Sequence, residues 1–436
     1  MNYFKLAADT WANAATFRAT RKRLKDYAYS RQWEDLTTTP EGKIITEGGL
    51  VRKDGRLPQT NNLIRPLIKS VVGRFRYNLT REELATDDFL REAYEANQLD
   101  ELDSRALEEF LISGCVIQRV GWEAFTDGEG IGVDNVNPNR FFVNRFFDSR
   151  GKDIRFIGMI HDMPIDRIKL CFAAGDSCKS GDSCKSKEIE EVYSKCDDMR
   201  HASISTIGKP GFEESFFYCA DEFMCRVIEV WSYDFDTDSE GHPDPHWHCR
   251  FFAPDGTLIA DTRSPFLHGS HPFALKFYPL TDGEVHSFIE DVVDQQRHIN
   301  QLITTIDAIL ANSAKGVLLL PSDALVDGMN AEAAARLWNH PGGVIPVNPR
   351  ASKFPQEVHS NGSCEGVYNL LDIEMRMFQQ ISGVSTAMQG MTPDSKTSAS
   401  LYEIQIYHSA ISLLDIFETF NSFRSLRDGL ILRSLR

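Results

Sequence analysis

The sequence lacks several features that would assign it quickly. No stretch approaches the ~18 consecutive apolar residues of a membrane span, and the first thirty residues lack the apolar core of a signal peptide. The phosphate-binding pattern GxxxxGK[ST], the GxSxG nucleophile turn and the HExxH zinc motif are also missing. These absences predict a cytosolic chain that does not itself hydrolyse nucleotides.

The cysteines form no framework. The 9 cysteines show neither CxxC knuckles nor the paired spacing of a secreted, disulfide-bonded domain. Two of them lie in the duplication GDSCKSGDSCKS at residues 175–186, whose Gly, Ser and Asp content predicts an exposed loop.

The charge is unevenly distributed along the chain. Residues 1–80 carry 15 Lys and Arg against 7 Asp and Glu, whereas the whole chain has a formal net charge of −16. The remaining residues are therefore strongly acidic. Such a body repels phosphate and does not suit a conventional DNA-binding groove, although it suits a surface that DNA must slide past.

Residues 1–283 read as mixed α and β. Helical patterns occupy the first thirty residues, whose second half is basic, and residues 59–77, where Pro66 could introduce a kink. Acidic helical stretches follow at 87–98 and 101–113. The segments CVIQRVGWEAF, RVIEVWSYDF and HWHCRFFAPDGTLIAD predict strands.

A single long helix is predicted from Glu284 to about Asn312, roughly 45 Å in length. One face is apolar and the other is polar, which predicts a helix with one packed face and one wet face. The packed face includes Val292, Ile299, Ile303 and Ile306. The acidic residues are Glu290, Asp291, Asp294 and Asp307.

The remaining chain alternates between a small module and helices. GVLLLP, NAEAAARLWNH and GGVIPV predict a strand, a short helix and a second strand. A helix is expected from about Cys364 to Ile381. Residues 382–400, SGVSTAMQGMTPDSKTSAS, predict a loop, because they hold too little apolar surface to order themselves. A long terminal helix is expected over 401–436.

This order of elements resembles the portal proteins of tailed bacteriophages. HPFALKFYPLTDGEVHSFIEDVVDQQRHIN at 271–300 is similar to the family's passage into its first stem helix. SGVSTAMQGMTPDSKTSAS is similar to its tunnel loop, with Thr397 and Ser398 as the closing pair. Gly316 and Gly362 would mark the corners between stem and clip.

The resemblance implies an α+β fold. Its expected parts are a wing (1–283), a first stem helix (284–314), a clip (315–360), a second stem helix (361–381), a tunnel loop (382–400) and a C-terminal wing or crown-base helix (401–436). In the tunnel loop, the residues expected nearest to DNA are Gln389, Thr392, Ser395 and Lys396.

The resemblance also implies a function. It predicts a non-enzymatic subunit of a ring of twelve copies, placed at one vertex of a capsid and assembled in the host bacterial cytoplasm. Double-stranded DNA would pass through the ring during packaging, retention and ejection. The expected partners are the large terminase ATPase, the major capsid and scaffolding proteins, and the head-completion and tail adaptor proteins. No cofactor, metal or membrane is expected.

Two other interpretations remain open. A metal-dependent nuclease or hydrolase could use Asp291 and Asp294, which are three residues apart on one predicted helix. It could instead use the cluster in GHPDPHWHC, which comprises His242, His246, His248 and Cys249, since an HxH pair on a strand places both imidazoles on one face. A structural adaptor that forms no channel would share the composition.

Overall fold

The computed structural model describes most of the chain, and its contacts divide it into two compact units. The described residues are 2–79, 88–125, 128–173, 182–203, 215–219, 221, 223–237, 242–313, 317–321, 323–326, 329–339, 344–351, 353–358, 365–385, 388–389 and 399–435. Unit 1 comprises 1–29, 62–293 and 381–436, and unit 2 comprises 30–61 and 294–380. The mixed α and β composition agrees with the α+β class.

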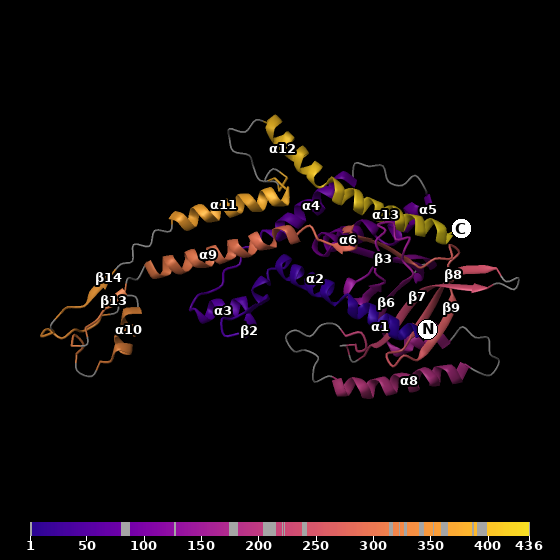
Figure 1. Cartoon of the computed structure of the whole chain (residues 1–436), viewed down its shortest axis with the longest axis horizontal. Helices are drawn as coiled ribbons and strands as arrows, with labels where there is room; N and C mark the ends of the chain where they lie inside the picture. Colours follow the sequence, from indigo (N-terminus) through magenta and orange to yellow (C-terminus); the bar gives the residue numbers. More distant parts are fainter. Residues whose placement is uncertain are drawn as a thin grey trace. The chain divides into compact units, whose positions relative to one another are not determined.

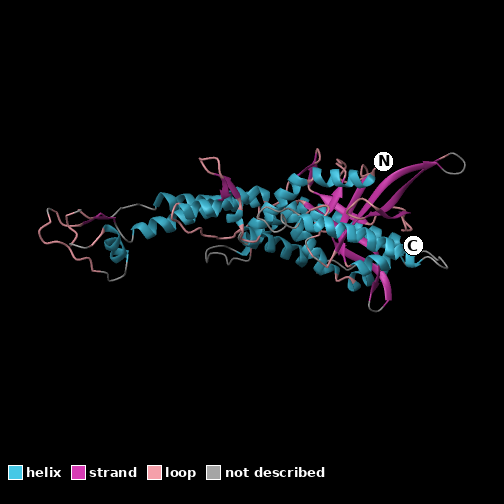
Figure 2. Cartoon of the chain, turned by 90° about the horizontal axis from the view of Figure 1, so that it is seen from below, coloured by secondary structure: helices cyan, strands magenta, loops and turns pink. Residues whose placement is uncertain are grey.

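Two antiparallel sheets organise unit 1 (Figure 2). The five-stranded sheet has the order β5 (Phe141–Val143), β6 (Phe156–Met163), β7 (Cys225–Thr237), β8 (Pro243–Phe252) and β9 (Leu258–Arg263). The three-stranded sheet has the order β10 (Phe273–Phe277), β3 (Cys115–Phe125) and β4 (Gly128–Asn135). The strands expected from the sequence at 115–125 and 226–235 are confirmed. The single strand expected over 246–261 is instead divided into β8 and β9 by a turn that Gly256, with φ of 87°, allows.

Helices cover both faces of the five-stranded sheet. Because side chains alternate along a strand, Ile228 and Val230 of β7 share one face and pack with Ala7 of α1 (Tyr3–Asn13). Val227 points to the other face, where it packs with Ile168 of α7 (Ile165–Ala173) and with α8 (Asp182–Ser203). The second copy of the GDSCKS duplication therefore runs into a helix from Asp182 onward, which corrects the expected loop at that end.

The basic N-terminal region forms two helices, in which Arg18 and Arg21 are buried whereas Arg23 is exposed. α1 ends at Asn13, and α2 runs from Ala15 to Ala28. Arg21 forms a two-pronged ion pair with Glu109 of α6 (Leu99–Ser113), with N–O distances of 2.6 and 2.8 Å. This part of the basic stretch therefore serves folding, because the guanidinium is buried and paired.

The other helices of unit 1 largely follow the sequence pattern. They include α4 (Ile64–Leu79), α5 (Asp88–Ala96) and α6. Pro66 lies in the first turn of α4, where a proline needs no hydrogen-bond partner, so it does not interrupt the helix. The predicted C-terminal helix is divided at Leu413 into α12 (Ala399–Ser412) and α13 (Leu414–Leu435). Ser412 Oγ donates to Ser409 O, and Leu413 is buried.

The long helix begins later than the periodicity predicts. Residues 279–285 form a hairpin of β11 (Pro279–Thr281) and β12 (Glu284–Val285), closed by Asp282 and Gly283 with φ of 53° and 79°. Asp-Gly is a strong signal for such a two-residue turn. A short 3-10 turn, η4 (Glu290–Val292), precedes the helix α9 (Val293–Ser313).

In unit 2, two long helices, α9 and α11, flank a small module. α11 spans Glu365–Ser382, and its helical part matches the sequence expectation within one residue at each end. Between the helices, β13 (Val317–Leu319) pairs with β14 (Gln356–Val358), and α10 spans Ala331–Asn339. Val347, in the predicted strand GGVIPV, instead makes an isolated bridge with Leu325.

The N-terminal extension of unit 2 was not anticipated. Residues 30–61 hold the 3-10 turn η1 (Gln32–Glu34), the hairpin of β1 (Leu36–Thr38) and β2 (Ile44–Thr46), and α3 (Glu47–Lys53). The β1–β2 hairpin is seen in Figure 2 as a small pair of strands beside the helices of this unit.

Candidate functional site

The candidate site is the helix pair α9 and α11, which run side by side in unit 2 (Figure 1). His298 of α9 lies across from Glu374 of α11, with 3.0 Å between Nδ1 and Oε1. Further along α11, Phe378 is buried, whereas much of the rest of that helix is exposed. Glu374 and Phe378 lie four residues apart and therefore share one face of α11.

A row of three polar side chains on α9 holds the segment that ends at Asn61. Gln296 Nε2 donates to Asn61 O at 2.6 Å, and Asn300 Oδ1 accepts from the Asn61 N–H at 2.8 Å. One turn further on, Thr304 Oγ1 accepts from the Gln59 N–H at 3.0 Å. All three side chains are buried, and their spacing of four residues places them on one face of the helix. We call Gln296, Asn300 and Thr304 the polar ladder.

The ladder and α11 lie on opposite faces of α9. Two residues of helix separate His298 from Asn300, which is a rotation of about 200°. α9 is thus enclosed between the 59–61 segment and α11, and Arg297 adds an ion pair to Glu47 at the start of α3. In the sequence, the spacing of four residues between Gln296, Asn300 and Thr304 was the available signal for this row.

The predicted packing residues are buried within one chain. Val292, Ile299 and Ile306 are buried, and Ile303 is half-buried. Because the chain's own elements cover Ile299 and Ile306, these two positions do not offer a free apolar surface to a neighbouring subunit.

The four predicted acidic residues do not make one stripe. Asp294 and Asp307 are both exposed on α9, but thirteen residues of helix turn them about 140° apart. Glu290 Oε2 accepts from the Ser287 N–H at 3.2 Å, and Asp291 Oδ1 lies 2.8 Å from His286 Nε2. Glu290 and Asp291 therefore act locally, as acids that favour the start of a helix.

The start of the predicted tunnel loop is packed. Val384 is fully buried, and the Ser385 N–H donates to Ser409 Oγ of α12 at 3.0 Å. The Gln389 N–H donates to Ser385 O at 3.2 Å. The expectation that the whole segment has no packed residues is thus corrected at residues 382–385. Thr392, Ser395 and Lys396 lie outside the described residues, as do the corner glycines Gly316 and Gly362.

The histidine cluster does not converge on one point. His246 and His248 share a face of β8, with ring centroids 4.9 Å apart, as the HxH spacing predicts. His248 Nδ1 pairs with Asp261 Oδ1 at 2.7 Å. Cys249 points the other way into the core beside Trp231, where burial raises the pKa of its thiol. His242, also in this motif, is exposed.

Neither metal hypothesis gains support from this geometry. Within the described ranges, no group of three or more His, Cys, Asp and Glu side chains is placed to hold a metal ion. In the same part of the chain, no helix combines the length and the apolar character needed to cross a bilayer.

A comparison with protein families gives the decisive result. The family model described as phage P22-like portal protein matches residues 3–431. The chain belongs to the phage P22-like portal protein family. The match covers both units. It includes residues 30–61, the end of which is held by the polar ladder. A search of curated proteins finds no match.

The polar ladder and the helix pair α9 and α11 lie within the region that the portal family model matches. The family match confirms the resemblance read from residues 271–300 and 382–400. The chain is therefore a phage portal subunit.

Proposed function

We propose that copies of this chain assemble into a ring at one vertex of a phage capsid, and that double-stranded DNA passes through the ring. The observation that carries the proposal is the family match over residues 3–431. It is supported by the order of helix α9, the module around β13–β14 and helix α11, which corresponds to the stem, clip and stem of the portal interpretation.

Exposed apolar stripes support self-assembly. On α11, three half-exposed side chains recur at helical spacing: Leu370, Ile373 and Met377. On α12, Ile404, Tyr407 and Ile411 form a similar stripe. Soluble monomers rarely expose large contiguous apolar patches, so each stripe fits a contact with another copy. A ring of twelve copies is the state that the resemblance implies.

The acidic character of the chain fits a channel whose inner surface, or wall, does not bind the DNA that passes through it. Lys and Arg contacts to phosphate release counterions and strengthen binding, whereas exposed carboxylates do not. We assign a wall position to Asp294 or to Asp307, one of which can face a channel that runs along α9. Gln389, Thr392, Ser395 and Lys396 are proposed to contact the DNA backbone weakly.

The subunit is proposed to be non-enzymatic and to hold no cofactor. A large terminase ATPase would dock on the clip and supply the hydrolysis, and head-completion and tail adaptor proteins would replace it after packaging. The major capsid and scaffolding proteins would surround the ring in the virion, after assembly in the host bacterial cytoplasm.

Packaging by reconstituted proheads tests the proposal. Proheads assembled with this chain should protect DNA from nuclease when terminase and ATP are added. Proheads assembled without it should protect only background amounts. Equal protection in both preparations would contradict the proposed role in packaging.

A further inference from the structure

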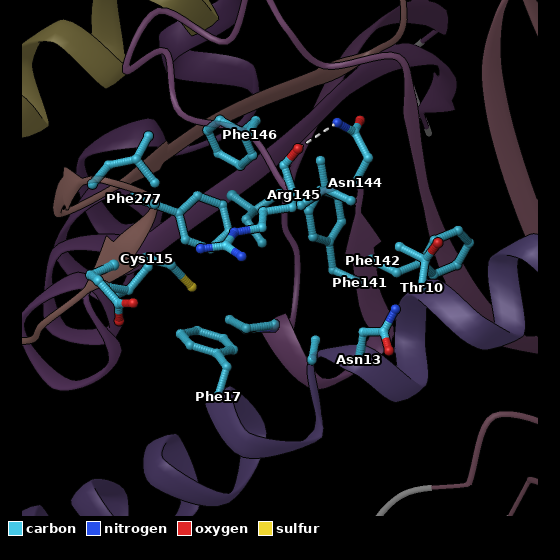
Figure 3. Close-up of a pocket in the computed structure, with 18 residues that line it drawn as sticks. Thr10, Asn13, Phe17, Cys115, Phe141, Phe142, Asn144, Arg145, Phe146 and Phe277 are labelled. Carbon is cyan, nitrogen blue, oxygen red and sulfur yellow. Dashed lines mark hydrogen bonds between the residues drawn. The ribbon is translucent and has the colours of Figure 1, made fainter.

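A cavity of about 730 Å³ opens in unit 1, where the turn between α1 and α2 faces β5 and the strands β10–β12 (Figure 3). Its wall includes five phenylalanines, which are Phe17, Phe141, Phe142, Phe146 and Phe277. A volume of ~300–1,000 Å³, apolar walls and a few polar groups are typical of a ligand site.

One cation reaches into this aromatic space. Figure 3 shows the side chain of Arg145 extending among Phe146, Phe277 and Phe17. Asn144 Nδ2 donates to Arg145 O at 2.8 Å, which fixes the backbone there. The described residues provide no ion pair for the guanidinium. Arg145 is exposed and its guanidinium carbon lies 5.1 Å from the centre of the Phe147 ring. Because this contact leaves the positive charge without an ion pair, the guanidinium favours a ligand that combines a carboxylate with an apolar body.

The cavity also adjoins the free edge of a sheet. β5 is the terminal strand of the five-stranded sheet, and Val143 lines the cavity. The Asn144 N–H donates to Phe156 O of the neighbouring β6 region at 2.9 Å, so the N–H and C=O of Val143 point away from β6. Within the described part of the chain, neither group of Val143 has a hydrogen-bond partner. Such an edge can accept an added strand.

We propose that this cavity binds an extended peptide segment of another protein, in which a large apolar side chain adjoins a carboxylate. The segment pairs with the outer edge of β5, its apolar side chain enters the aromatic space, and its carboxylate pairs with Arg145. Glu284 also lines the cavity and would repel a second carboxylate, so the segment carries its acid at the Arg145 end. This proposal does not depend on the DNA channel.

Fluorescence polarisation with a labelled peptide of sequence GSDFVSG tests the proposal on the full chain. Two control peptides replace Asp by Lys or Phe by Ser. The unmodified peptide should bind one site per chain, and each control should bind about tenfold more weakly or worse, because it removes the ion pair or the apolar anchor. Equal binding of all three peptides would overturn the proposal.

Variants locate the site. Arg145→Glu should reduce affinity for the peptide at least about tenfold, and Glu284→Gln should increase it a few-fold. Lys152→Glu is the matched control, because Lys152 is an exposed cation outside the cavity wall, and it should leave affinity unchanged. An equal loss from Arg145→Glu and Lys152→Glu would show general charge attraction and overturn the proposed site.

Two further arms test how the peptide binds and what occupies the site. Methylation of the peptide's backbone nitrogens that would pair with β5 should weaken binding about tenfold. Unchanged binding would overturn the proposed strand addition.

Phenylpropionate should bind much more weakly than the peptide. Equal affinity would overturn the proposal of a peptide ligand in favour of a small aromatic acid. If the peptide no longer binds once the chain has self-assembled, the occupant of the cavity is a second copy of this chain. That result would overturn the proposal that the segment belongs to another protein.

Discussion

The backbone N–H of Asn61 donates to Asn300 Oδ1 at 2.8 Å, across 239 residues of sequence. Asn300 is fully buried, and its neighbours on the ladder hold the same segment from one turn before and one turn after it. The long helix of unit 2 is therefore braced by an N-terminal segment through side-chain contacts to backbone groups.

Removing this bond should weaken the brace. In Asn300→Leu, the Asn61 N–H loses the buried acceptor Asn300 Oδ1, which should cost about 0.5–1.5 kcal/mol in the free energy of unfolding. Limited proteolysis should also cleave residues 30–61 faster. Gln301→Leu is the control, because Gln301 is an exposed neighbour on α9, and it should leave both measurements nearly unchanged. Equal effects of the two changes would contradict the bracing role.

A second buried network fastens the C-terminal helix. Arg427 of α13 is fully buried and pairs with Asp103 of α6, which also accepts from Arg424 at 3.0 Å. In Asp103→Ala the buried guanidinium loses its main partner, so the free energy of unfolding should fall by about 3–5 kcal/mol. Denaturant unfolding measures this loss. Asp88→Ala is the control. It removes an exposed ion pair with Arg91 and should change the free energy of unfolding by less than about 1 kcal/mol.

Glu229 should make stability depend on acid pH. Burial alone would raise the pKa of this carboxyl, but Arg119, His161 and Trp231 stabilise the charged form and lower the pKa from 4.5 to about 2. Because the folded-state pKa is depressed, its contribution is present above pH 4.5 and is lost as pH falls toward 2.

Unfolding curves at several pH values check this. The stability difference between the wild type and Glu229→Gln should be largest near neutral pH and should shrink between pH 4.5 and 2. Glu41→Gln, at an exposed site, should show a small and nearly constant difference. A Glu229→Gln difference that stays constant across this window would refute the assignment.

The acidic wall can be tested one residue at a time. Asp294 and Asp307 point in different directions from α9, so only one should line a channel that runs along the helix. In assembled rings, Lys at that position should raise DNA affinity and steepen its salt dependence, since each new phosphate contact adds about 0.9 to the slope. Lys at the other position should have little effect. Equal increases from both changes would rule out this geometry.

The tunnel loop gives a functional test. Replacing residues 390–395 by a Gly-Ser linker of equal length should preserve ring formation but reduce the amount of full-length DNA retained in filled heads. The amount of nuclease-protected DNA measures retention. If this variant retains as much DNA as the wild type, residues 390–395 serve only as a linker between helices.

The sequence predicts the elements that periodicity controls. The helix at Glu365–Ser382 and the strand at Cys115–Phe125 follow the expected patterns closely, because apolar spacing of 3.6 or 2 residues marks a buried face directly. The start of α9 was misplaced because Glu284 and Val285 fit the helical period, although Asp282 and Gly283 encode a hairpin turn.

Long-range pairing was harder to anticipate. Nothing local in Gln356–Val358 shows that it pairs with Val317–Leu319, and the role of Asn300 depends on a segment 239 residues away. The phenylalanine-lined cavity could not be predicted from the sequence for the same reason, since Phe17 and Phe277 meet only in the folded chain. Such sites follow from tertiary structure and not from any single motif.

The most direct test of the account is the assembly state of the purified chain and of one surface variant. Negative-stain images of the wild type should show rings with a central hole. Ile373→Asp places a charge on the half-exposed stripe of α11, so it should lower the ring fraction while the melting temperature of the monomer stays unchanged. Compact monomers for the wild type at all concentrations, with no rings, would contradict the portal assembly proposed here.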